Sequence, residues 1–253
     1  MNNSQAYTDK KKNFDRLITV YGRNVVLEIL EEKDINVTKV HLADSNKKDG
    51  VISKIESICA KKNIEVLYHS KQALSRISKN AKQDQGVCAD IEATSYLSTQ
   101  DFLDSKSSAY RYIALDSIHN PQNLGMIIRS VAAGFVDGII LPKKGSAKIS
   151  PLVIKASAGT LFKTSILYCD DLETVLPEFK QDGADIYALS SHAKESLFDL
   201  QLGKKTIFVL GNESEGVCKE VEKLSNKTLS IPMKNGVESL NVAVTAALLA
   251  YYS

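Results

Sequence analysis

Apolar and polar positions repeat along the chain either with the period of a helix or with that of a strand. The places where one period gives way to the other mark the ends of the expected elements. In the first part, short runs with strand spacing alternate with stretches of helical spacing. Strands are expected at residues 37–42, 65–68 and 87–91, and helices at residues 25–30, 51–62 and 71–77. The pattern predicts a small α/β domain over residues 14–92, preceded by a polar tail at residues 1–13.

A Ser- and Thr-rich segment at residues 93–109 has little apolar periodicity, which predicts a linker to a second domain at residues 110–253. Strands are expected there at residues 112–115, 138–141, 185–189, 206–210 and 229–231, and helices at residues 123–133, 151–161, 171–179, 219–225 and 242–252. Short buried strands that alternate with helices are typical of a mostly parallel α/β sheet with helices on both faces.

The composition fits a globular chain of two domains. The 253 residues are 43% hydrophobic and 25% charged, which are ordinary values and carry no functional message. Residues 1–90 hold 16 Lys and Arg against 12 Asp and Glu, whereas the rest holds 16 against 18. A basic first domain suits a polyanion, because Lys and Arg contacts to phosphate dominate nucleic-acid affinity, although random surface variation explains the difference equally well.

No segment predicts an export signal, a membrane span or a metal site. The polar N-terminus lacks the apolar core of a secretory signal, and no apolar run approaches the roughly 18 residues of a membrane helix. The cysteines are far apart and form no C-x-x-C pair; they are Cys59, Cys88, Cys169 and Cys218. We expect a cytoplasmic protein with reduced thiols, no membrane contact and no bound metal.

Three segments of the second domain place polar residues where an apolar strand gives way to another element. They lie at residues 123–129, 210–216 and 231–242. Ligands of parallel sheets bind beyond the carboxyl ends of the strands. We therefore expect the three segments to form one site.

Spacing alone leaves the chemistry of these segments open. Gly211 and Gly216 have the skeleton of a phosphate loop, but its Lys and Ser or Thr are missing, and carboxylates such as Glu213 would repel phosphates. Asn123 is as well placed to cap a helix as to take part in chemistry. Arg129 interrupts an apolar helical stretch, so we expect it either to pair with an acid or to face a site, where its donors suit phosphate oxygens.

Together, the three segments resemble the signature motifs of the SpoU/TrmH family, the RNA ribose 2′-O-methyltransferases of the SPOUT class. The matching residues are Asn123-x-Gly125-x-x-x-Arg129, Gly211-Asn212-Glu213-x-x-Gly216, and Ile231-Pro232-Met233 followed by Ser239-Leu240-Asn241-Val242. The resemblance covers about residues 110–253. Residues 21–28 resemble the start of the ribosomal-protein-like substrate-binding module that precedes the catalytic domain in many members.

The resemblance implies that the C-terminal part of the chain is tied into a deep trefoil knot and that S-adenosylmethionine binds in the knotted loops. The implied cofactor-binding residues are Leu210, Gly211, Ile231, Met233, Ser239 and Leu240. It also implies a homodimer in which the last helix packs on its partner. Many relatives have Ser where this chain has Ala243, and we expect no loss of activity from that departure.

The resemblance assigns the catalytic roles to Arg129, Asn123, Glu213, Ser239 and Asn241. An arginine is an awkward base because its pKa exceeds about 12, which favours an electrostatic role on the phosphate and the developing alkoxide. The implied partner is structured RNA, with 23S rRNA favoured by the two-domain layout and tRNA as the alternative. The alternative outside the enzymes is a non-catalytic RNA-binding or ribosome-assembly factor of the same fold.

Overall fold

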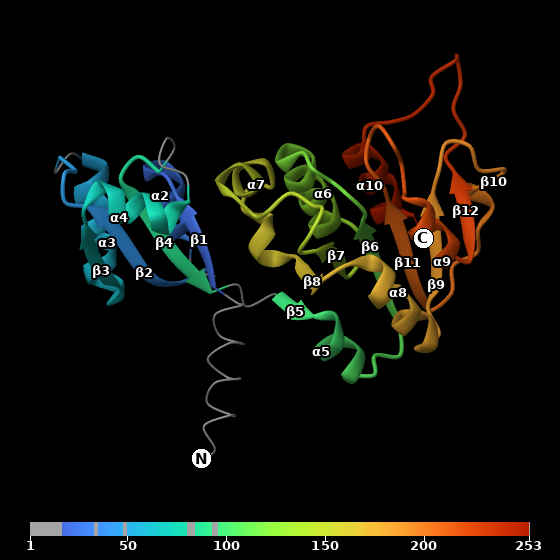
Figure 1. Cartoon of the computed structure of the whole chain (residues 1–253), viewed down its shortest axis with the longest axis horizontal. Helices are drawn as coiled ribbons and strands as arrows, with labels where there is room; N and C mark the ends of the chain where they lie inside the picture. The colour runs from blue at the N-terminus through green and yellow to red at the C-terminus, as the bar shows by residue number, and fades with distance from the viewer. Residues whose placement is uncertain (1–16, 33–34, 48–49, 80–83, 93–95, 253) are drawn as a thin grey trace. The chain divides into compact units, whose positions relative to one another are not determined.

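The structure is a computed structural model that describes residues 17–32, 35–47, 50–79, 84–92 and 96–252 (Figure 1). The chain divides into two units, residues 1–94 and residues 95–253, which we describe separately. The predicted polar tail at residues 1–13 lies outside the described residues. Within the described ranges, no helix combines the length and the apolar character needed to cross a membrane.

The first unit is a four-stranded sheet with helices packed against it (Figure 1). Its elements are β1 (Leu17–Tyr21), α2 (Arg23–Glu31), β2 (Asn36–Ala43), α3 (Gly50–Lys62), β3 (Glu65–His69), α4 (Lys71–Ser78) and β4 (Val87–Glu92). The strand order is β1-β4-β2-β3, in which β2 and β3 are parallel and the other neighbours antiparallel. The predicted strands and helices of this unit are confirmed, whereas β1 was not predicted, because a short apolar run does not reveal its own secondary structure.

The second unit contains a larger sheet with helices on both faces. Its elements up to the middle are β5 (Tyr96–Ser98), α5 (Thr99–Asp104), β6 (Tyr110–Leu115), α6 (Pro121–Ala133), β7 (Gly138–Pro142), α7 (Pro151–Ala156), the 3-10 turn η1 (Thr160–Lys163) and β8 (Ser165–Cys169). The remaining elements are α8 (Leu172–Gln181), β9 (Asp185–Leu189), β10 (Glu195–Ser196), η2 (Leu197–Asp199), β11 (Lys205–Leu210), α9 (Lys219–Leu224), β12 (Lys227–Ser230) and α10 (Val242–Tyr251).

Neighbouring strands described in this sheet are all parallel, in the order β10-β12-β9-β11-β6-β7-β8-β5. Tyr110 and Tyr112 of β6 join a buried core with residues of α8 and α9. Successive side chains of a strand point to opposite faces, so the buried Ile113 faces the other side, where α6 and α10 pack together. The predicted mostly parallel α/β sheet is confirmed.

The linker predicted at residues 93–109 is wrong for most of its length. Strand β5 pairs with β8 at the edge of the second sheet, and α5 follows directly. The polar residues of this stretch begin a helix instead, because the Ser98 hydroxyl accepts a hydrogen bond from the Asp101 N–H at 3.0 Å. Phe102 then packs in the aromatic core of the second unit. Residues 93–95 lie outside the described residues.

The helix predicted over residues 151–161 is interrupted. It ends at Ala156, and η1 follows after Ala158 and Gly159, whose φ angles of 49° and 75° are left-handed and cannot continue an α-helix. Strands β8 and β10 were not predicted. β8 is a five-residue run without a turn signal before it, and β10 has only two residues, so neither carries a usable period.

The segment between β12 and α10, residues 231–241, has no regular secondary structure, and Figure 1 shows it as a long loop. Helix α10 then packs against α6, where the Phe135 N–H donates to the Ala250 carbonyl at 2.6 Å. Only one side of α10 is buried. Val244 is 45% and Leu248 38% exposed. Because this helix is apolar on every side, as predicted, its uncovered side is apolar too.

Candidate active site

Side chains from the three predicted segments meet beyond the carboxyl ends of β6 and β11. The Asn123 amide donates to the Glu213 carboxylate, and the Asn241 Nδ2 donates to the Asn123 Oδ1 at 3.3 Å. The Asn241 Oδ1 accepts from the Ala243 N–H at 2.8 Å and so caps α10. We call Asn123, Glu213 and Asn241 the amide–carboxylate cluster. Its members are up to 118 positions apart in the sequence.

Asn123 does not cap the helix that carries it. Helix α6 begins earlier than predicted, at Pro121, and its cap is Asn120, whose Oδ1 accepts from the Gln122 N–H at 2.9 Å. Asn123 is instead buried, with 8% of its surface exposed, and its side chain links Glu213 to Asn241. Of the two roles that the sequence allowed for Asn123, capping of the helix is therefore excluded.

The loop that carries Glu213 is closed on itself and fastened to the loop after β6. Backbone bonds join Asn212 and Gly216 in both directions at 3.0 and 2.9 Å, and the Asn212 Nδ2 donates to the Ser117 carbonyl at 3.0 Å. A Cβ on Gly211 would lie 2.0 Å from a backbone atom of Gly216. Only glycine permits this approach, so Gly211 shapes the turn that presents Glu213.

Asp116 fastens the other end of this loop. It is not among the site residues predicted from the sequence. Its N–H donates to the Leu210 carbonyl at 2.8 Å, and its carboxylate accepts from the Cys218 N–H at 2.7 Å. The side chain is 8% exposed. An acid directly after an apolar strand was the available signal, because it stands at the same edge of the sheet as the three segments.

Arg129 lies on α6 but outside the amide–carboxylate cluster. Helical geometry places it about 9 Å along the axis and about 120° around it from Asn123. Its side chain is exposed and, in the part of the chain that the structure describes, forms no ion pair or hydrogen bond. The predicted pairing with an acid is therefore wrong, since an exposed guanidinium carries no desolvation cost. The alternative, that Arg129 faces a site, stays open.

The residues predicted to hold a cofactor lie at the ends of β11 and β12 and in the loop before α10. Leu210 is buried, Gly211, Ile231 and Met233 are partly exposed, and Ser239 and Leu240 are exposed. Among the described groups of residues 233–240, backbone hydrogen bonding is limited to the bond from Val237 to Lys234. The loop therefore offers apolar side chains together with backbone donors and acceptors. Ser239 forms no hydrogen bond with the amide–carboxylate cluster there.

The thiols of this unit and the loop residue His192 stand apart from the cluster. Burial, with the nearby Asp116, raises the pKa of the Cys218 thiol, and burial raises that of Cys169 to about 12, so both are neutral at pH 7. His192 lines a polar hollow of about 430 Å³ near the ends of β9 and β12. No member of the amide–carboxylate cluster lines that hollow.

Both units match known families. The model of the SpoU rRNA Methylase family matches residues 110–251, and the model for RNA 2'-O ribose methyltransferase substrate binding matches residues 19–97. The two matches divide the chain at nearly the same place as the structure does.

Relatives cover nearly the whole chain. It is 31% identical over 235 residues to a 23S rRNA (guanosine-2'-O-)-methyltransferase of Xylella fastidiosa, covering 92% of this chain and 94% of that protein. A tRNA/rRNA methyltransferase of Mycolicibacterium gilvum is 30% identical over 248 residues, which cover 97% of this chain and 78% of that protein. A SpoU methyltransferase of Streptomyces viridochromogenes, solved in complex with AdoMet, shares the fold with a TM-score of 0.66, 21% identity and coverage of 95% and 90%.

The parallel sheet with a polar cluster at its carboxyl edge, preceded by a substrate-binding unit, defines the class as RNA methyltransferase. The chain belongs to the SpoU rRNA Methylase family.

Proposed function

We propose that the protein methylates a ribose 2′-hydroxyl of structured RNA with S-adenosylmethionine as the methyl donor, and that the substrate is 23S rRNA, reached in the cytoplasm. The observation that carries the proposal is the amide–carboxylate cluster, which joins all three motif segments at one edge of the sheet. The relative from Xylella fastidiosa supports rRNA, because its match spans both units.

A tRNA substrate is the second candidate. A solved structure that concerns 2-OH methylation of C/U34 on tRNA is 27% identical to this chain, with a TM-score of 0.51. It covers only 57% of this chain. The matched part of the chain is too short to include both units, so this similarity says nothing about the whole two-unit layout. Methylation mapping decides between the two RNAs.

The loops after β11 and β12 fit the methyl donor in chemical character. Ile231, Met233 and Leu240 supply apolar side chains, and the neighbouring backbone groups supply donors and acceptors, with Leu210, Gly211 and Ser239 completing the set. S-adenosylmethionine carries the methyl group on a positively charged sulfur. Glu213 is the exposed carboxylate of the amide–carboxylate cluster and offsets such a charge.

S-adenosylmethionine would supply the methyl group: its bond from sulfur to the methyl carbon would break as that carbon bonds to the ribose oxygen, and the hydroxyl proton would pass to solvent water. We assign Arg129 to the RNA phosphate beside the target ribose, where its charge stabilises the developing alkoxide. Asn123 holds Glu213 in place and is itself held by Asn241, and we assign Ser239 to the entrance. Positioning of the two reactants supplies much of the remaining rate enhancement.

We propose that the chain between β12 and α10 is threaded to form a deep trefoil knot. Two features support this: β12 lies inside the sheet between β10 and β9, and residues 231–241 are irregular before the chain returns to pack on α6. Pulling single molecules from both ends tests it. A tight knot shortens the fully stretched chain, whereas an unknotted chain reaches its full contour length.

We propose a homodimer through the α6–α10 face. This face consists of exposed apolar side chains on α6, on the turn that follows it and on α10. They are Met126, Phe135, Val244, Leu248 and Tyr251, of which Phe135 is 71% exposed. Exposed apolar patches of this kind mark interaction sites. Leu248→Glu should convert a dimer to a monomer in sedimentation velocity, while Lys61→Glu on α3 should leave the dimer intact. A wild-type monomer contradicts the proposal.

Arg129 lies on α6, whose exposed surface belongs to this face, so a second copy would cover it. We propose that the guanidinium completes the active site of the partner subunit. Mixing Arg129→Ala protein with Glu213→Ala protein then restores activity, because each mixed dimer holds one intact site. If Arg129 serves its own chain, mixed dimers contain no intact site and the mixture stays inactive.

The proposed reaction is tested by tritium transfer from S-adenosylmethionine to ribosomal and transfer RNA, followed by mapping of the methylated ribose. One 2′-O-methylated position in 23S rRNA is the expected result. Methylation of a base, or of tRNA alone, would refute the proposed substrate. Donor binding without transfer to any RNA would instead favour the non-catalytic RNA-binding or assembly factor.

A further inference from the structure

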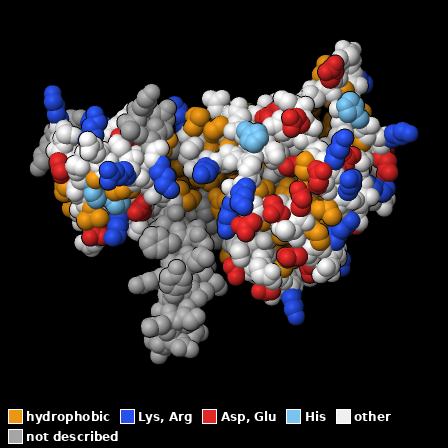
Figure 2. All heavy atoms as spheres, in the orientation of Figure 1, with side chains coloured by type: hydrophobic (Ala, Val, Ile, Leu, Met, Phe, Trp, Pro, Cys, Tyr) orange, Lys and Arg blue, Asp and Glu red, His pale blue; other side chains and the backbone are white. Residues whose placement is uncertain are grey.

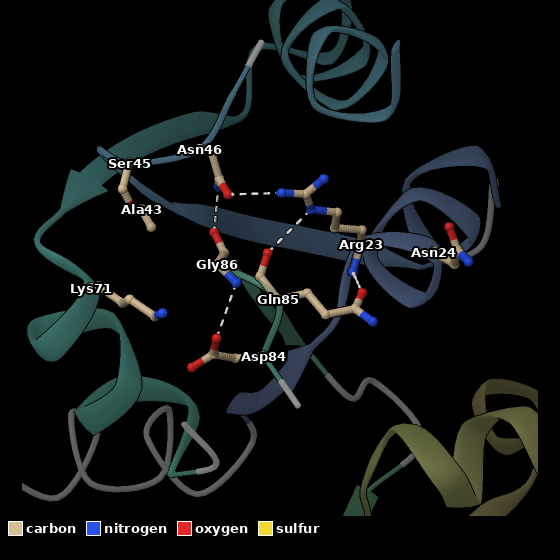
Figure 3. A pocket seen from close by; sticks show the side chains of 9 residues that line it. All are labelled: Arg23, Asn24, Ala43, Ser45, Asn46, Lys71, Asp84, Gln85 and Gly86. Carbon is tan, nitrogen blue, oxygen red and sulfur yellow. Dashed lines mark hydrogen bonds between the residues drawn. The ribbon is translucent and has the colours of Figure 1, made fainter. Parts of the chain in front are cut away.

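The first unit contains a polar pocket of about 660 Å³, separate from every residue assigned to catalysis (Figure 3). It lies where β2 ends and where α2 and α4 begin. The side chains and backbone that shape it are those of Arg23, Asn46, Lys71, Asp84, Gln85 and Gly86.

A network of hydrogen bonds centred on Arg23 holds one wall of the pocket. The Arg23 Nε donates to the Gln85 carbonyl at 3.2 Å, and its Nη2 donates to the Asn46 Oδ1 at 3.2 Å. The Arg23 N–H donates to the Gln85 Oε1 at 3.1 Å, and the Asn46 Nδ2 donates to the Gly86 carbonyl at 2.7 Å. We call Arg23, Asn46, Gln85 and Gly86 the Arg23 network. Because it joins three segments, the wall is formed before any ligand arrives.

The carboxylate of the pocket, Asp84, is buried and hydrogen-bonded within the first unit. Asp84 is 2% exposed, and its oxygens accept from the Ser78 hydroxyl at 2.9 Å and the Gly86 N–H at 3.0 Å. Ser75 donates to the same carboxylate at 3.3 Å. These donors hold Asp84 within the wall, so the carboxylate is an internal acceptor of the pocket and is not a free surface charge.

Lys71 is the cation that remains available. Its side chain is exposed and, among the described residues, forms no hydrogen bond or ion pair; Figure 3 shows its amino group extended into the pocket. Lys71 is also the first residue of α4, where the helix dipole disfavours a positive charge. A lysine that opposes its own helix dipole and has no partner among the described residues points to a ligand outside the chain.

We propose that this pocket binds a backbone phosphate of the RNA substrate, with Lys71 as the phosphate contact and the Arg23 network as the preformed wall. The inference rests on the proposed function for the identity of the polyanion. None of the described residues that line the pocket is aromatic, so these residues suit the RNA backbone and not base stacking. Lys and Arg side chains are spread over the visible face of this unit, as a polyanion requires (Figure 2).

The test measures binding of the full-length protein to an RNA hairpin with an unpaired loop, over a series of salt concentrations. Lys71→Ala should weaken binding several-fold at low salt and reduce the slope of log affinity against log salt by about 0.7 to 1. Lys61→Ala removes an equal charge from an exposed site on α3 and should change neither. Lys71→Ala should not lower the denaturation midpoint, because the lysine opposes its helix dipole.

Equal losses for Lys71→Ala and Lys61→Ala, or an unchanged salt slope for Lys71→Ala, would overturn the inference. Inorganic phosphate that competes with the hairpin at similar concentrations would also overturn it, since the pocket would then be a general anion site. The proposed function fails separately: if wild-type protein transfers no methyl group to RNA while hairpin binding still depends on Lys71, the pocket stands and the reaction does not.

Discussion

Two polar networks stand at the edges of the two sheets, and they are built in opposite ways. In the Arg23 network, side chains bond mainly to backbone carbonyls and N–H groups, which the fold already holds. In the amide–carboxylate cluster, the bonds join side chain to side chain across three separate segments, and Glu213 is exposed.

The difference follows from what each network is proposed to do. A binding pocket gains affinity when its walls are formed in advance, because ordering costs are then paid during folding. A reacting site must admit a donor and an RNA strand, which agrees with the exposed Glu213 and with the position of Arg129 outside the cluster. Substitutions in the two networks should therefore separate binding from turnover.

The largest effect is expected from Arg129→Ala. It removes the proposed stabiliser of the alkoxide, so the methyl-transfer rate should fall by about 10²–10³-fold while the affinity for S-adenosylmethionine stays nearly unchanged. Tritium transfer measures the first quantity and calorimetry the second. Arg129→Lys keeps the charge but loses the planar fork and should recover only part of the rate. An equal loss of donor affinity would count against the assignment.

A smaller effect, about ten- to a hundredfold in turnover, is expected from Asn123→Ala. The change leaves Glu213 and Asn241 without their shared partner, at a cost of about 1–3 kcal/mol. Asn46→Ala is the matched change in the Arg23 network and should raise KM for RNA with kcat unaltered. If Asn46→Ala lowers kcat as much as Asn123→Ala does, the contrast between the networks is wrong.

Gly86→Ala should destabilise the protein by about 1–2 kcal/mol in urea denaturation, because φ is +75° and an added Cβ would lie 2.5 Å from the Asn46 Oδ1. Gly183→Ala is the control: its φ is +87°, but nothing lies within 4 Å of the added Cβ. The excess cost of Gly86→Ala over the control measures the rigidity of the Arg23 network. Equal costs would mean that the network yields easily.

The smallest effect concerns pH. Burial alone would raise the pKa of Asp90, but hydrogen bonds from His41 and Thr19 outweigh it and hold the pKa below its ordinary 3.8. The first unit should thus keep this stabilisation above pH 3.8 and lose it as the pH falls further. Asp90→Asn should flatten this acid limb in urea titrations, and the exposed Asp44→Asn should not. An unchanged limb in Asp90→Asn excludes the contribution.

The fold was predictable wherever a segment has a strong period. The helices α3 and α6 and the strands β2 and β11 were found because their apolar spacing extends over several residues. The failures were short or context-dependent elements. β1 and β8 were missed, and a linker-like composition at residues 93–109 concealed a capped helix, since Ser is favoured both in loops and at helix starts.

The candidate site divides in the same way. The sequence indicated Asn123, Glu213 and Asn241 through motif resemblance, and the structure brings them together. Asp116 and the pocket around Lys71 were not found, because their partners are distant in the chain and no local pattern marks them. The sequence left open whether Arg129 pairs with an acid or faces a site, since apolar neighbours along a helix do not show which side is covered.

By itself, the sequence determined the alternation of strands and helices and the three motif segments, because periodicity and residue identity are properties of neighbouring positions. Only the tertiary structure decided which distant groups meet, which side of α10 stays uncovered and that Lys71 lies at a polar pocket. Hydrogen bonds and burial depend on the packing of segments up to 118 positions apart, and local spacing carries no record of that packing.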